Sequence, residues 1–120
     1  MDTRFATVTL HAGTSVLWDY SARGVGRRHE IAAPVFSLDG SDVTMALKTV
    51  RPLGAPRDLP NGCREFTYVG DVSGEAGLQL KVVFRAAEDD PVVRFRYEVL
   101  SDRPRRLTKP AGTDKIRYLG

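Results

Sequence analysis

The sequence predicts an all-β domain of antiparallel strands, arranged as a β-sandwich. Two observations lead to this class. Short runs of alternating apolar and polar residues recur between Gly, Pro, Asp and Asn, at intervals of roughly 8–12 residues. Helical periodicity is nearly absent, because only residues 100–107 and 43–50 can be fitted to it, and the second segment fits strict alternation better. We therefore expect a sandwich that resembles a supersandwich. We also expect it to be truncated, since the sequence stops at Gly120 within a segment that has the pattern of a strand.

The N-terminal third contains two strand-like runs. In residues 4–11, Ala6, Val8 and Leu10 alternate with Phe5, Thr7 and Thr9. In residues 15–20 the alternation places Val16, Trp18 and Tyr20 on one face. The Gly- and Arg-rich segment 23–28 follows as a loop.

A tight hairpin is predicted in the next third. The dipeptide Asp39-Gly40 suits the positive φ angles of a two-residue turn and lies between the runs 34–38 and 42–51. In the second run Val43, Met45 and Leu47 face the core. The intervening residues, which include Lys48, face the solvent.

Residues 52–62 are expected to form the longest loop. This segment holds three prolines and two glycines, so we predict that it forms no ladder of backbone hydrogen bonds. Strand character resumes at residues 64–72, before a turn at residues 73–77.

The clearest hairpin spans residues 78–100. Its first arm places Leu78, Leu80, Val82 and Phe84 on one face. A turn at residues 88–91 leads to the second arm. There an apolar face (Val93, Phe95, Tyr97, Val99) opposes a charged face (Arg94, Arg96, Glu98). Full burial of each apolar side chain contributes roughly 1.5–3 kcal/mol, so a one-residue slip in register is strongly disfavoured.

Length and composition limit the function classes. A chain of 120 residues suits one domain, and a net charge of +3 is too close to balance to indicate nucleic-acid binding. We expect neither a membrane span nor a secretory signal, which favours the cytoplasm. The single Cys63 excludes an internal disulfide, and the wide spacing of His11 and His29 gives no metal motif. No cofactor is predicted.

Catalytic residues are not predicted within this chain. Two adjacent acids, Asp89 and Asp90, precede Pro91 and suit a turn better than a glycosidase pair. Glu65 and Glu98 fall on polar strand faces and are expected to be solvated. The densest basic cluster (Arg103, Arg105, Arg106, Lys109) and the smaller pair Arg27-Arg28 favour solvated edges over polyanion binding.

Four residues are candidates for contact with a carbohydrate. Trp18 has a ring that could stack on a sugar, although its alternation favours the core. Arg57, Asn61 and Arg64 flank the long loop and could donate hydrogen bonds to hydroxyl groups, or could simply stabilise its turns.

The pattern of strand-like and turn-like segments in this sequence resembles that of one known family. Residues 77–85 and 90–97 look like the N-terminal β-domain of α-galactosidase-type glycoside hydrolases, the melibiase and raffinose-family clan. Residues 107–109 with Gly112, Asp114 and Tyr118 are similar to the middle of that domain, and residues 33–40 and 61–66 fit it more loosely. The resemblance covers about residues 30–119.

This resemblance implies that residues 1–120 form one N-terminal β-sandwich domain of a longer protein. It further implies a downstream (β/α)₈ barrel that carries the catalytic aspartates of a retaining mechanism, an α-galactoside as substrate, and a homo-oligomer. In that setting the domain is non-catalytic and packs on the barrel, with residues 57–64 near its entrance. The alternative is a free-standing module that binds a carbohydrate or another protein.

Overall fold

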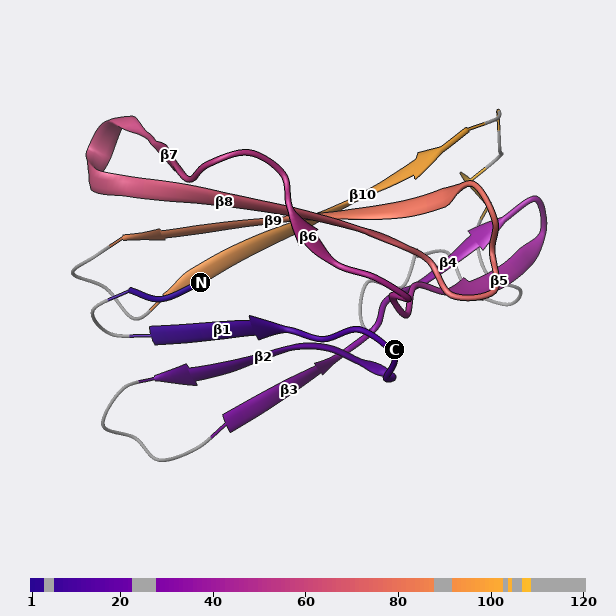
Figure 1. Ribbon diagram of the computed structural model, residues 1–120, viewed down its shortest axis with the longest axis horizontal. Coiled ribbons are helices and arrows are strands. Elements are labelled where there is room, and N and C mark those ends of the chain that lie inside the picture. Colours follow the sequence, from indigo (N-terminus) through magenta and orange to yellow (C-terminus); the bar gives the residue numbers. More distant parts are fainter. Residues whose placement is uncertain (4–5, 23–27, 88–91, 103, 105–106, 109–120) are drawn as a thin grey trace.

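The computed structural model describes residues 1–3, 6–22, 28–87, 92–102, 104 and 107–108 (Figure 1). Within these ranges the chain forms three antiparallel sheets and one short 3₁₀ turn, with no α-helix. The all-β antiparallel class is confirmed, and the sheets are open rather than closed into a barrel. None of the described segments is a helix with the length and apolar character needed to cross a bilayer.

The elements follow one another along the chain with short connections. In chain order they are β1 (Ala6–Leu10), β2 (Val16–Ala22), β3 (Arg28–Ala32), β4 (Val35–Leu38), β5 (Ser41–Thr44), β6 (Arg51–Pro52), β7 (Arg57–Asp58), η1 (Pro60–Gly62), β8 (Cys63–Asp71), β9 (Leu78–Ala87), β10 (Val93–Ser101) and β11 (Leu107–Thr108).

The long sheet has the order β10-β9-β8-β6, and β7 also pairs with β8. The predicted hairpin of residues 78–100 is confirmed, with Tyr97 opposite Val82 and Phe95 opposite Phe84. On its other side β9 pairs with β8, where Tyr68 lies opposite Val82. The predicted turn at residues 88–91 lies outside the described residues.

Two predictions about the long loop and the preceding strand were wrong. Within residues 52–62, Arg57–Asp58 pairs with β8, and Pro52 pairs with Tyr68. Proline is tolerated there because a short edge strand does not need its missing N–H. The strand predicted over residues 42–51 ends at Thr44. Beyond it an isolated bridge joins Leu47 to Val72, and Arg51 already belongs to β6.

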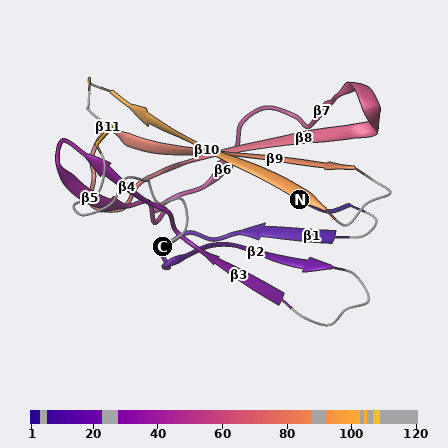
Figure 2. The same ribbon diagram turned by 180° about the vertical axis from the view of Figure 1, so that it is seen from behind.

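The small sheet has the order β1-β2-β3 and covers one face of the long sheet (Figures 1 and 2). The predicted alternation of β1 is confirmed by the burial of Ala6 and Val8. In β2 the register shifts between Val16 and Trp18, so Leu17 and Trp18 are both buried. Simple alternation placed Leu17 and Trp18 on opposite faces, and the irregularity explains why both lie in the core.

The third sheet has the order β11-β4-β5 and lies at one end of the molecule (Figure 2). Its hairpin turn is the predicted Asp39-Gly40, with φ angles of 52° and 82°. Two positive φ angles in succession are the signature of a type I′ turn. The strand expected where the chain stops at Gly120 lies outside the described residues.

One hydrophobic core joins the three sheets. Trp18 from the small sheet makes edge-to-face contacts with Phe84 and Phe95 of the long sheet, each at 5.1 Å between ring centroids. Met45 and Leu47, which follow the third sheet's hairpin, belong to the same core. We call the core-facing side of the long sheet its inner face and the opposite side its outer face.

Burial departs from the predicted pattern at two positions of the long sheet. Phe95 was expected in the core but is 39% exposed, because β10 lies at the margin of the sheet. Val83 alternates with Val82 and so faces away from this core, but it is only 3% exposed. Its paired neighbours on the outer face, Thr67 and Arg96, belong to the strands on either side.

Candidate functional site

A row of charged residues crosses the outer face of the long sheet. In register, Arg57 of β7 lies opposite Glu65 of β8, Glu65 lies opposite Arg85 of β9, and Arg85 lies opposite Arg94 of β10. Directly opposed residues in antiparallel strands project from the same face and lie close together. The pairing of four strands thus assembles a site that spans almost forty residues of sequence.

Glu65 is the only carboxylate in this row, and two arginines hold it. Arg57 Nη2 donates to Glu65 Oε1 at 3.1 Å, and Arg85 Nε donates to Glu65 Oε2 at 2.8 Å. The hydrogen bond from Arg85 is the largest influence on the pKa of Glu65 and lowers it, while burial opposes this effect. The positive charges of Arg57, Arg85 and Arg96 lower the same pKa further, so Glu65 is ionised at neutral pH.

Arg94 and Arg96 lack such compensation. Within the described ranges no carboxylate lies within 4.0 Å of either guanidinium. Arg94 lies directly opposite Arg85, and like charges in this position destabilise a sheet. This part of the face therefore presents four guanidinium groups (Arg57, Arg85, Arg94, Arg96), and Glu65 pairs with two of them. Such an arrangement favours the binding of an anionic group from a ligand or partner.

Two hollows adjoin this row and share Arg85 and Arg94. The smaller one, about 190 Å³, is lined by Val83, Arg85 and three consecutive residues of β10 (Arg94, Phe95, Arg96). The larger one, about 440 Å³, extends to the η1 turn, where Leu59, Pro60 and Cys63 line it together with Ala86, Ala87 and Val92. Apolar walls beside guanidinium groups suit a ligand with a compact apolar body and an anionic group.

The structure brings some of the predicted sugar-contact residues to this face and leaves others away from it. Arg57 is part of the charged row. Arg64 alternates with Glu65 along β8, so it projects from the other face, where its Nε donates to Asp58 Oδ1 at 2.9 Å. Asn61 lies in η1, and its side chain is outside the described part.

Trp18 does not belong to this face. It is 3% exposed, and its indole N–H donates to the hydroxyl of Tyr97 at 2.9 Å. Edge-to-face contacts with Phe84 and Phe95 complete its surroundings. Trp18 therefore lies in the core, as its alternation favoured. Neither face of its ring is open to a sugar.

The residues of this face were not predicted to form a site, because Glu65, Arg94 and Arg96 were assigned separately to polar faces of their strands. The hairpin register, which was predictable, already places Arg85 opposite Arg94. The contribution of Glu65 and Arg57 depends on pairing between β7 and β8, which the proline-rich composition argued against. The predicted basic clusters at residues 103–109 and 27–28 lie mostly outside the described residues.

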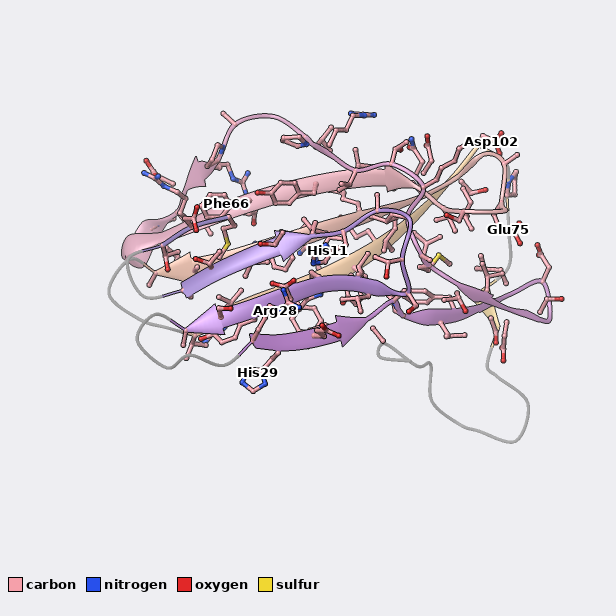
Figure 3. All side chains as sticks on the ribbon, turned by 60° about the horizontal axis from the view of Figure 1, so that its bottom comes forward. His11, Arg28, His29, Phe66, Glu75 and Asp102 are labelled. Atoms are coloured by element: carbon pink, nitrogen blue, oxygen red, sulfur yellow. The ribbon has the colours of Figure 1, made fainter. Side chains whose placement is uncertain are left out.

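A second polar cluster lies on the small sheet (Figure 3). His11 Nε2 lies 2.5 Å from Asp19 Oδ2, and Arg28 Nε lies 4.0 Å from the same oxygen. Asp19 is buried, so these neighbours compensate a charge that would otherwise be costly. His29 projects away from the sheet (Figure 3). No group of three metal-ligating side chains is found among the described residues.

Comparison of the chain with protein-family models, with curated proteins and with solved structures finds no significant match.

Proposed function

We propose that this chain is a non-catalytic β-sandwich domain that docks on a partner through the outer face of its long sheet. The observation that carries the proposal is the group of arginines on this face, where Arg94 and Arg96 lack acidic partners in the described chain. Arginine is favoured in interfaces because its planar fork binds carboxylates in pairs of hydrogen bonds and tolerates desolvation. The matching surface on the partner is therefore acidic.

The particular partner follows from the family resemblance of residues 77–97 and the more loosely fitting segments. In the α-galactosidase-type hydrolases that these residues resemble, a β-sandwich precedes a catalytic barrel. We propose that the chain fills this role, packs on a downstream barrel and shapes its entrance. Support for this finer assignment comes from the pattern of strands and turns in the sequence.

Two measurements test this role. Sequencing of the gene beyond Gly120 should reveal a barrel with aspartates at its strand ends. The isolated chain should leave a chromogenic α-galactoside unhydrolysed, whereas a chain that includes the barrel should hydrolyse it. A stop codon directly after Gly120, or turnover by the isolated chain, would contradict the proposal.

The docking face is tested with the two domains expressed separately. Arg94→Glu should weaken their association at least tenfold, because it places a carboxylate where the partner is acidic. Lys48→Glu is the matched control, since Lys48 is an exposed cation between β5 and β6 and carries the same change of charge. Equal effects of the two variants would show that net charge, rather than this face, governs association.

A second candidate function is a carbohydrate-binding module, which the 440 Å³ hollow beside η1 favours. Because Arg85 and Arg94 line this hollow, an acidic sugar is a better ligand than a neutral one. Calorimetric titration should show saturable binding of galacturonate and much weaker binding of galactose or raffinose. Arg94→Ala should abolish the difference, whereas Arg64→Ala should leave it, since Arg64 lies on the other face of β8. Equal affinity for galactose and galacturonate would exclude this reading.

A further inference from the structure

The outer edge of β10 is open in the described chain. β10 pairs with β9 along its full length, from Val93 opposite Ala86 to Ser101 opposite Leu78, and no described strand pairs with its other side. Residues 94–100 of this edge present a row of backbone donors and acceptors that can template another strand. The edge is long enough to select a partner strand of defined register.

Exposed apolar side chains gather at the same edge. The large apolar residues that are most exposed in the described chain are Leu53, Val92, Phe95 and Leu100, and the last three lie on or just before β10. Phe95 and Leu100 are each 39% exposed. Their side chains project from opposite faces of the sheet, so a partner that covers only one face would leave one of them exposed. A strand added beside β10 would cover both faces at once.

The charges along β10 are self-complementary. Arg94 and Arg96 precede Glu98 at alternate positions of the outer face. The Glu98 side chain is 41% exposed, and Lys81 Nζ lies 3.2 Å from its Oε2. Nevertheless, Oε2 is buried without a hydrogen bond of good geometry. A second cation is therefore favourable beside this carboxylate.

We propose that β10 pairs with β10 of a second copy of this chain, antiparallel and centred on Tyr97. In this register Arg96 lies opposite Glu98 of the second copy, and the two-fold symmetry repeats the pair. Phe95 meets Val99 of the second copy on the inner side, and the alkyl part of Arg94 covers Leu100 on the outer side. All nine residues of the strand are paired, and the two long sheets become one continuous sheet.

Neighbouring registers are excluded by charge and by face. Centring the pair on Arg96 or on Glu98 would bring like charges directly opposite each other, which is destabilising. A shift of one residue would place Arg96 opposite Val99. Charged residues of the outer face would then be paired with apolar residues of the inner face. The register centred on Tyr97 satisfies both constraints and pairs the complete strand.

Charge reversal combined with mixing tests this register. Sedimentation velocity of the intact chain should show a dimer that dissociates on dilution. Arg96→Glu and Glu98→Arg should each raise the dissociation constant at least tenfold, because each variant opposes two like charges across the two-fold axis. When the two variants are mixed, the two acids of one copy lie opposite the two arginines of the other. A heterodimer should therefore form with an affinity near that of the unaltered chain.

The double variant Arg96→Glu/Glu98→Arg restores both pairs and should form a homodimer. Lys48→Glu is the control, and circular dichroism with thermal melting confirms that each variant is folded. A chain that stays monomeric at high concentration would overturn the proposal, as would single variants that dimerise as well as the unaltered chain. A mixture that fails to associate would overturn the register. The inference does not rest on the proposed docking role, because its readout is the association of identical chains and needs no barrel or sugar.

Discussion

The two faces of the long sheet bury their central residues by different means. On the inner face, Val82 and Phe84 are covered by the small sheet, whose Trp18 contacts Phe84 directly. On the outer face no sheet of the described chain covers Val83, which is flanked by residues with long polar side chains. The inner face therefore holds the two sheets together, whereas the outer face buries Val83 beneath long charged side chains. Burial alone therefore does not identify a residue of the core between the sheets.

The largest expected effect comes from opening the inner face. Phe84→Ala removes a fully buried ring that contacts Trp18 and Tyr68, and leaves a cavity between the sheets. We expect a loss of about 3–5 kcal/mol in the free energy of unfolding. Urea denaturation would measure it. A loss below about 1 kcal/mol would show that the two sheets do not depend on this contact.

A matched pair of substitutions compares the faces directly. Val82 and Val83 are neighbours on one strand and both are buried, but they face opposite sides of the sheet. Val82→Ala should cost about 2 kcal/mol, because its cavity lies between rigid sheets. Val83→Ala should cost about 1 kcal/mol or less, since flexible side chains can close over the gap. Equal losses in urea denaturation would contradict the distinction between the two kinds of burial.

The smallest expected effect concerns Glu65 and its dependence on pH. Its pKa is lowered in the folded chain, so its contribution to stability is present above its ordinary value near 4.5 and is lost as the pH falls through the folded pKa. Glu65→Gln should therefore be less stable than the unaltered chain at pH 7, by about 0.5–1 kcal/mol. The difference should vanish in strong acid. Thermal melting from pH 7 to pH 2 would measure it, and a difference that grows on acidification would contradict the assignment.

The features predicted from the sequence are those that local chemistry determines. Asp39-Gly40 specifies its turn through backbone conformation, and the alternation around Leu80 and Val82 specifies a strand with one buried face. The register irregularity near Leu17 is not visible in alternation, because an extra residue in a strand has no sequence signature of its own. Residues 57–58 join β8 through tertiary pairing that overrides a composition poor for strands.

The candidate site was harder to predict than the fold, since its residues meet only through pairing across four strands. Arg57 was identified for a different reason, its proximity to a long loop. Arg94 was assigned to a charged face, and only its position opposite Arg85 distinguishes these two residues from ordinary solvated cations. Trp18 was identified correctly as a core residue by its pattern, and its possible contact with a sugar is removed by its burial.

Trp18 also gives the protein a built-in optical reporter. It is the single tryptophan of the chain, and it lies where the small sheet meets Phe84 and Phe95 of the long sheet. Its emission spectrum will therefore depend on whether these two layers are in contact, independently of the strands within each layer. Stopped-flow refolding followed by this fluorescence can be compared with far-ultraviolet circular dichroism, which detects strand formation itself. A lag between the two signals would separate the assembly of each layer from their closure on one another.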